Sequence, residues 1–190
     1  MVSNNLNELK KYVKMGNFVS LVLTNQNNTQ KVNTNLIKYL TTEAKMPGVY
    51  ITINKPYSVL KRDFEAKKIN TNLVIFIDAI SNDSEKSKKV EGCLFVNSPK
   101  SLSDISIALS EAINKIPSKN KFVFFDSLST LLMYNDPNTV GRFVHFIANK
   151  MRDWKVSGMI LSLDNNAKAD ASGVSQFVDV LLDFSKEAKE

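Results

Sequence analysis

Residues 21–40, "LVLTNQNNTQKVNTNLIKYL", contain the pattern of a buried strand, a polar loop and a helix. An apolar run that ends at Thr24 indicates the strand, and Leu36, Ile37 and Leu40 begin a stripe with the three- and four-residue spacing of a helix. The residues between them are almost all polar. A strand that leads through a polar loop into a helix is the repeating unit of α/β proteins, so this stretch predicts the fold class.

The same stretch has the outline of the phosphate-binding motif G-x-x-x-x-G-K-[ST], whose glycines let backbone amides surround phosphate groups. A lysine is present at the expected position, but both glycines and the final hydroxyl are replaced. The sequence thus predicts a degenerate nucleotide-binding loop made of Asn25, Asn28, Thr29, Gln30, Lys31 and Val32. Asparagine tolerates left-handed backbone better than most residues, which leaves a nest of amides open. Lys31 has two interpretations, a residual anion-binding residue or an exposed residue in the first turn of a helix.

Extended and helical patterns alternate along the whole chain. Six apolar, β-branched runs are expected to be strands, at residues 18–23, 49–53, 73–77, 122–125, 159–163 and 178–184. Ser101 and Asp136 are expected to cap two of the intervening helices, with Pro137 at the first helical position of the second. Continuously apolar strands that alternate with helices predict a three-layer α/β/α sandwich with a mainly parallel sheet. No linker is evident, so we expect a single domain over residues 1–190 with a core of about 15–185.

The composition excludes several classes of protein. With 43% hydrophobic residues in 190, the chain is long enough to bury a core. Cys93 and His145 are single residues of their types, which excludes an internal disulfide and a Cys/His zinc site, and we expect a buried thiol and a surface or packing imidazole. No signal peptide or membrane span is evident, so we expect a cytoplasmic protein without membrane contact.

The charge is uneven along the chain. Residues 1–100 contain 15 Lys/Arg and 8 Asp/Glu, whereas residues 101–190 contain 10 and 11. A basic surface attracts nucleic acid or acidic partners, but runs of charge more often serve solvation alone.

A second motif follows the fourth predicted strand, in "KFVFFDSLSTLL", residues 121–132. Four apolar residues lead to Asp126 and Ser127, which is the pattern of a Walker B segment, where a strand-end aspartate holds magnesium beside the phosphate loop. The alternative is structural: Asp126 would cap the next helix by accepting from the amide of Leu128 or Ser129.

At these residues the chain resembles the KaiC-like branch of the RecA superfamily, which includes many small archaeal ATPase-like proteins. "FVFFDSLSTLL" is similar to the Walker B segment of that branch, "MPGVYITINKPYSVLKRDF" (residues 46–64) to its second strand and following helix, and "SGMILSLDNN" (residues 157–166) to the strand with the polar sensor. The resemblance covers roughly residues 15–185 and implies a RecA/KaiC-like P-loop NTPase fold with a sensor-like Asp164. Asp164, Asn165 and Asn166 are alternatively turn formers.

The chain also departs from that family. In KaiC-like ATPases one or two glutamates that activate water end the second strand, and the matching positions here are Asn54 and Lys55. An amide and an ammonium group cannot accept the proton. The loop glycines and the Mg²⁺-binding hydroxyl are lost as well, so the cradle, the metal ligand and the base are all changed. We therefore expect no catalytic residue, no metal site and no resident cofactor, with ATP and Mg²⁺ bound weakly or not at all.

Three functions stay open from the sequence. The first, which we favour, is a catalytically inactive KaiC/RecA-like module, a pseudo-ATPase, that regulates or assembles through a protein partner or through self-association, as relatives in the resembled family form rings or filaments. The second is an ATP-binding ATPase with an atypical loop. The third is a nucleic-acid-binding RecA relative that uses the loop "NNAKADASGVS", residues 165–175, but this loop has no aromatic residue for base stacking.

Overall fold

The computed structural model describes residues 2–81, 90–164 and 173–186. Its centre is a seven-stranded sheet in the order β4-β3-β2-β5-β6-β1-β7, and every pair of neighbouring strands is parallel. The strands are β1 (Val19–Thr24), β2 (Gly48–Thr52), β3 (Val74–Asp78), β4 (Cys93–Phe95), β5 (Phe122–Asp126), β6 (Ser157–Leu163) and β7 (Val180–Asp183). The parallel sheet expected from the apolar runs is confirmed.

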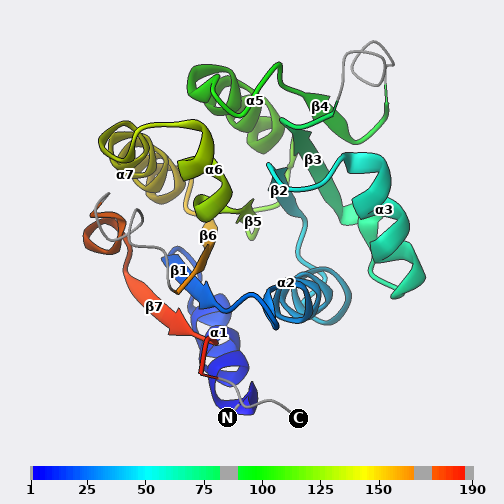
Figure 1. The fold of residues 1–190 in the computed structure, drawn as a ribbon. Helices are drawn as coiled ribbons and strands as arrows, with labels where there is room; N and C mark the ends of the chain where they lie inside the picture. Colours follow the sequence, from blue (N-terminus) through cyan, green and yellow to red (C-terminus); the bar gives the residue numbers. More distant parts are fainter. Residues whose placement is uncertain (1, 82–89, 165–172, 187–190) are drawn as a thin grey trace.

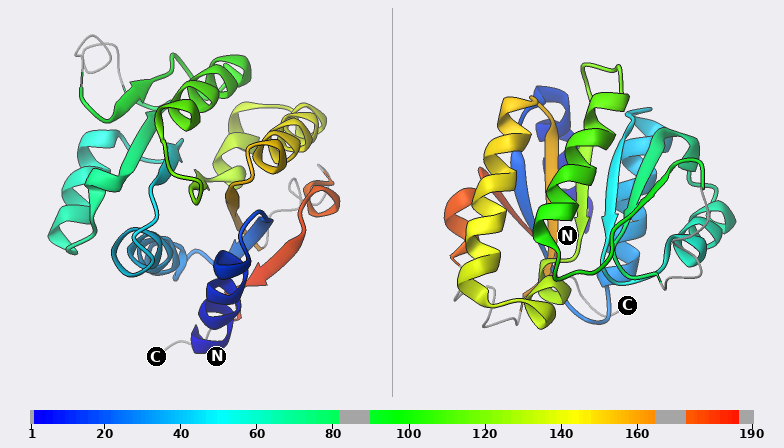
Figure 2. Two further views of the ribbon diagram at one scale, coloured as in Figure 1. Left: turned by 180° about the vertical axis from the view of Figure 1, so that it is seen from behind. Right: turned by 90° about the horizontal axis from the view of Figure 1, so that it is seen from above.

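Helices cover both faces of the sheet (Figures 1 and 2). One face carries α1 (Val2–Met15), α2 (Thr29–Lys38) with its π-helical continuation η1 (Tyr39–Glu43), and α3 (Tyr57–Ala66). The other carries α5 (Leu102–Lys115), α6 (Leu128–Tyr134) and α7 (Pro137–Asp153). Two short 3₁₀ turns, η2 (Thr71–Leu73) and η3 (Val174–Phe177), precede β3 and β7. The two faces bury separate apolar clusters, which gives the expected three layers.

Six strands lie where the apolar runs predict them, and β4 is the strand that the sequence analysis missed. It has only three residues and forms one edge of the sheet, so its apolar run is too short to show a period. Cys93 begins this strand and is buried, as expected, and burial raises the pKa of its thiol.

The caps differ from expectation at one helix. Asp136 caps α7 by accepting hydrogen bonds from the amides of Asn138 and Thr139, at 3.0 and 3.2 Å, and Pro137 occupies the first turn. Ser101 does precede α5, but its side chain makes no capping hydrogen bond. Only the backbone carbonyl of Ser101 accepts, from Ile105 at 3.1 Å.

The sheet order places the site. The connection from β1 to β2, which contains α2, crosses β6 and β5, and β2 pairs with the edge of β5 that faces away from β6. Because all strands are parallel, Thr24 and Asp126 end at the same edge of the sheet, and Thr52 is the register partner of Asp126. Ligands in open α/β sheets bind outside this carboxyl edge, near the point where the strand order reverses.

Candidate functional site

The loop between β1 and α2 is closed by its own side chains. Asn25 Oδ1 accepts from the amides of Asn27 and Asn28, at 2.9 and 3.0 Å, and Asn28 Oδ1 accepts from the amide of Asn25 at 3.0 Å. The amide of Thr29 donates to the carbonyl of Asn25 at 3.0 Å. Neither Asn25 nor Asn28 has a positive φ. The left-handed backbone that would open an amide nest is therefore not present at these two positions.

The same two asparagines also fasten the chain that leaves β7. Asn25 Nδ2 donates to the carbonyl of Ser185 at 2.6 Å, and Asn28 Nδ2 donates to the carbonyl of Phe184 at 2.7 Å. In each of these two side chains, Oδ1 accepts from an amide of the loop and Nδ2 donates to a carbonyl after β7. The two side chains therefore hold the loop closed and bind it to the chain that follows β7.

Helix α2 begins at Thr29, so the other residues of the predicted loop are helical. Gln30 and Lys31 are exposed on its first turn, whereas Val32 is buried in the cluster that α2 shares with the sheet. The side chain that replaces the Mg²⁺-binding hydroxyl is thus part of the apolar core.

The carboxylate of Asp126 is buried and surrounded by hydrogen-bond donors. Its Oδ2 accepts from the Tyr50 hydroxyl at 2.5 Å and from Asn33 Nδ2 at 2.9 Å, and its Oδ1 accepts from Asn54 Nδ2 at 2.6 Å. Asn33 Nδ2 also donates to the Tyr50 oxygen at 2.7 Å. The donors come from α2, β2 and the exit of β2. Asp126 therefore joins three elements of the fold.

Two pKa values in this network depart from their ordinary range. Burial raises the pKa of Asp126, and the hydrogen bonds from Tyr50, Asn54 and Asn33 and the charge of Lys55 oppose that rise. Burial and the adjacent Asp126 raise the pKa of Tyr50, which stays a phenol at every physiological pH. The hydroxyl of Tyr50 is consequently a permanent donor to the carboxylate.

The alternative in which Asp126 caps α6 is wrong. Ser127, the other predicted Walker B residue, caps this helix by accepting from the amide of Thr130 at 3.4 Å. Asp126 accepts instead from side chains of neighbouring elements, because its carboxylate faces the α2 and α3 layer.

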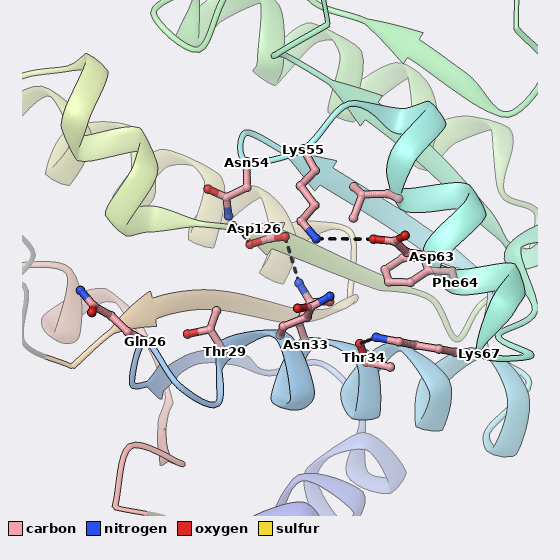
Figure 3. Close-up of a pocket in the computed structure, with 12 residues that line it drawn as sticks. Gln26, Thr29, Asn33, Thr34, Asn54, Lys55, Asp63, Phe64, Lys67 and Asp126 are labelled. Carbon is pink, nitrogen blue, oxygen red and sulfur yellow. Dashed lines mark hydrogen bonds and ion pairs between the residues drawn. The ribbon is translucent and has the colours of Figure 1, made fainter.

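A pocket of about 240 Å³ opens above this network, between α2 and α3 (Figure 3). Of the predicted residues, Thr29, Gln30, Asn54, Lys55 and Asp126 line it. The lining includes seven further residues that the sequence analysis did not single out, namely Gln26, Asn33, Thr34, Leu60, Asp63, Phe64 and Lys67.

Besides Asp126, the charged residues that line the pocket are Lys55, Asp63 and Lys67, which lie just before, on and just after α3. Lys55 Nζ is 3.5 Å from Asp63 Oδ2, and Lys67 Nζ donates to Thr34 Oγ1 at 3.0 Å. Figure 3 shows Lys67 reaching from the end of α3 to Thr34 on α2, whereas Lys55 points from the segment after β2 toward Asp63. Leu60 and Phe64 are buried residues of α3 and form an apolar wall.

The other predicted site residues lie outside this pocket. Lys31 and the buried Val32 do not line it. Asp164 is exposed at the end of β6, where its amide donates to the carbonyl of Thr24 at 2.8 Å. The structure does not bring Lys31, Asp126 and Asp164 together in one pocket. Residues 165–172 of the loop considered for nucleic acid lie outside the described residues.

Magnesium nucleotide does not fit these residues in the way that the phosphate-loop motif requires. That motif needs free backbone amides and a hydroxyl beside the Walker B carboxylate. Here the loop amides of Asn25, Asn27, Asn28 and Thr29 donate to oxygens of the loop itself, and the residue at the hydroxyl position is a buried valine.

The single histidine has a packing environment. His145 lies 4.7 Å from Phe177, measured between ring centroids, and its Nε2 is 3.1 Å from Asn149 Nδ2. Within residues 2–81, 90–164 and 173–186, no group of three or more His, Cys, Asp or Glu side chains is arranged to hold a metal ion. None of the described helices has the length and apolar character needed to cross a membrane.

The residues that the sequence analysis missed carry weak local signals. Asn33 is a polar residue at the edge of the apolar stripe of α2, and Tyr50 contributes a hydroxyl between the apolar residues Val49 and Ile51 of β2. A buried hydroxyl or amide needs a hydrogen-bond partner. Each of these residues therefore signals a partner, but its sequence context does not say which one.

Comparison with known proteins gave a family and a fold. A family model described as "Family of unknown function (DUF7504)" matches residues 33–184. No match was found among curated proteins. The crystal structure of the KaiC-like protein PH0186 from the hyperthermophilic archaeon Pyrococcus horikoshii OT3 is similar, with a TM-score of 0.63 and 12% identity over 92% of this chain and 75% of that one. At this identity the likeness shows a KaiC/RecA-like fold.

Proposed function

We propose a function from the site of this chain, which belongs to DUF7504, a family of unknown function. The protein is a KaiC/RecA-like module without ATPase activity, and it acts by binding a protein partner or a second copy of itself. In this proposal the nucleotide loop is kept as a structural turn. The strand ends that hold a catalytic centre in active relatives serve to join α2, β2 and β5.

The observation that carries the proposal is the state of the Asp126 carboxylate. It already accepts from the side chains of Asn33, Tyr50 and Asn54, and hydrogen bonds to an ionised group contribute about 1.5–3 kcal/mol each. A magnesium-bound water would have to compete with donors of this strength. Asn54 and Lys55, at the positions of the water-activating glutamates, have no group that accepts a proton.

Support for a partner surface comes from the opposite helical layer. Ile107, Met133 and Phe146 are 67%, 78% and 48% exposed, on α5, α6 and α7 respectively. Single exposed apolar side chains are common on soluble proteins, but these three belong to one layer of the fold. A partner that covers this layer would remove them from water.

The absence of ATPase activity is tested by measuring Mg²⁺-dependent phosphate release from ATP and the melting temperature with Mg·ATP. We expect no release above the level without protein. A ligand at a hundred times its Kd adds about 2.7 kcal/mol of stability, and we expect no shift of that kind. Lys31→Ala is the diagnostic variant and Lys38→Ala, an exposed lysine of the same helix, is its control. Phosphate release that disappears in Lys31→Ala and persists in Lys38→Ala would overturn the proposal.

The partner half is tested by molar mass in solution and by capture experiments with the double variant Met133→Glu/Phe146→Glu. We expect self-association or partner capture by the unmodified protein to be lost in the double variant while its melting temperature is kept. A monomer that captures the same proteins with and without the two substitutions would show that this layer is not the partner surface.

A further inference from the structure

The sheet ends at β4, whose outer edge pairs with no further strand within residues 2–81, 90–164 and 173–186. On its inner edge the amide of Val96 donates to the carbonyl of Asp78, and the carbonyl of Gly92 accepts from the amide of Phe76, both at 2.8 Å. In a parallel pair, alternate residues of a strand bond to the neighbouring strand. Phe95 therefore directs its backbone amide and carbonyl to the outer edge, where they can pair with another chain.

A groove of about 290 Å³ lies along this edge, between β4 and α5, and Figure 1 shows the helix beside the strand. Leu94 and Val96 of the strand side belong to the apolar cluster under α5, and Ile107 and Ala108 line the groove from the helix. Ile107 is 67% exposed. A single exposed apolar side chain is common, but this one lies in a groove next to an unpaired strand edge. The groove thus offers an apolar contact and backbone hydrogen bonds together.

The charge of the groove is acidic. Asp104 and Glu111 line it, three residues before and four residues after Ile107, which places all three on one face of α5. No Lys or Arg is among the residues that line the groove, although the chain as a whole has a net charge of +6. The described ion pair of Glu111, with Lys115 at 2.6 Å, is exposed, and pairs of this kind contribute little to stability. The groove is therefore complementary to a basic segment.

We propose that this groove binds an extended segment of a protein partner, which adds to the sheet as a further strand beside β4. The segment has one large apolar residue, which covers Leu94 and Ile107. Lys or Arg residues two positions before and two positions after it pair with Asp104 and Glu111. The site rests on the proposed function, because the segment belongs to the protein partner that the module binds.

The spacing of the basic residues follows from helix and strand geometry. Asp104 and Glu111 are seven residues apart, which is about 10 Å along a helix. Because α5 connects the parallel strands β4 and β5, it runs back alongside them. Side chains on one face of a strand recur every two residues, so residues four apart are separated by about 13 Å. The long side chains of Lys and Arg cover the difference, and the residue midway between them meets Ile107. In this mode of recognition the main chain supplies affinity and alternate side chains supply specificity.

The probe is a fluorescent nine-residue peptide with lysine at positions 3 and 7, leucine at position 5 and threonine elsewhere, titrated with the full chain and followed by fluorescence polarisation. We expect saturable binding that weakens as salt increases, because exposed ion pairs are screened. A peptide of the same composition with lysine at positions 4 and 6 places both charges on the opposite face of the strand, and we expect it to bind at least about tenfold more weakly. Methylation of the central three backbone nitrogens is expected to weaken binding by a similar factor. Equal binding of the methylated peptide would overturn the strand pairing, and no binding of the first peptide would refute the site.

The diagnostic variant is Asp104→Lys/Glu111→Lys. Its control is Glu8→Lys/Glu65→Lys, which makes the same change in net charge at two exposed residues outside the groove. Melting temperatures without peptide check that both variants are folded. We expect the diagnostic variant to bind the lysine peptide at least about tenfold more weakly and to bind a peptide with glutamate at positions 3 and 7 instead, whereas the control keeps the preference of the unmodified protein. Equal loss in both variants would show that overall charge attracts the peptide and would overturn the groove as its site.

The variant Met133→Glu/Phe146→Glu separates this site from the partner surface of α6 and α7. Neither residue lines the groove, so we expect that variant to bind the lysine peptide as tightly as the unmodified protein. Hydrolysis of Mg·ATP would overturn the proposed function even with peptide binding intact. Peptide binding that disappears in Met133→Glu/Phe146→Glu and persists in Asp104→Lys/Glu111→Lys would refute the groove and leave the proposed function standing.

Discussion

Replacing Tyr50 by phenylalanine isolates one bond of the buried network without disturbing its packing. The ring of Tyr50 is fully buried and stacks on Phe124, with 5.3 Å between the centroids, and phenylalanine keeps this contact. The lost atom is the hydroxyl, which donates to Asp126 Oδ2 and accepts from Asn33 Nδ2. Asn33 Nδ2 keeps Asp126 as its second acceptor, at 2.9 Å. The cost is therefore that of one hydrogen bond to the carboxylate.

A hydrogen bond to a charged group contributes about 1.5–3 kcal/mol, so we expect Tyr50→Phe to lower the free energy of unfolding by about that amount at neutral pH. The cost should shrink in acid. Burial raises the pKa of Asp126, and the Tyr50 bond is the largest effect that opposes this rise. Removing the bond raises the folded-state pKa further while the unfolded-state pKa stays the same. The folded variant then binds the proton of Asp126 more tightly. The loss of unfolding free energy caused by Tyr50→Phe is therefore largest at a pH above the folded-state pKa of Asp126, and it falls as the pH decreases through that pKa.

Urea unfolding followed by circular dichroism, at neutral pH and near pH 4, roughly the ordinary range of aspartate, measures both effects. Tyr57→Phe is the control, because Tyr57 packs on Phe76 in the same aromatic cluster and its hydroxyl does not contact Asp126. We expect the control to change stability by less than about 0.5 kcal/mol at both pH values. A Tyr50→Phe cost that is absent at neutral pH, or that is larger in acid than at neutral pH, would refute the network.

Three further substitutions test the loop, the sheet and a helix cap. Asn25→Ala removes the acceptor of two loop amides and the donor to the carbonyl of Ser185, so we expect a loss of about 1–3 kcal/mol in urea unfolding; an unchanged midpoint would mean that the loop is not held by this side chain. Gly48→Ala places a Cβ 2.4 Å from the ring of Phe122, and we expect a melting temperature lowered by the equivalent of about 1–3 kcal/mol. A variant as stable as the wild type would show that the ring of Phe122 can move away without cost. Asp136→Ala removes the cap of α7 and is expected to cost about 1 kcal/mol in thermal unfolding, and a stabilised variant would contradict the capping role.

The fold class was available from the sequence because its signals are local. Apolar runs and helical stripes alternate within windows of about ten to fifteen residues, which is the range where periodicity is informative, and six of the seven strands follow from them. Strand β4 escaped because three residues cannot show a period. The choice of a parallel sheet also follows from local order, since each connection between these strands is long enough for a crossover helix.

The composition of the site was only partly available in this way. The motifs identified Asn54, Lys55 and Asp126 at the ends of two strands, and because a parallel sheet brings its strand ends to one edge, the three line one pocket. The motif alignment also located the loop after β1, but it did not show that Asn25 and Asn28 would close it. Whether an amide is free or bonded depends on side-chain rotamers, which no spacing of residues encodes.

The contacts of Asp126 were decided by tertiary structure alone. Its donors Asn33 and Tyr50 lie 93 and 76 positions away in the chain, and Lys67 is 33 positions from Thr34. Each pairing depends on the register of β2 against β5 and on the rotation of α2 and α3 over the sheet. A shift of one residue in a strand turns every side chain to the opposite face, so these contacts exist only once the packed layers fix both register and rotation.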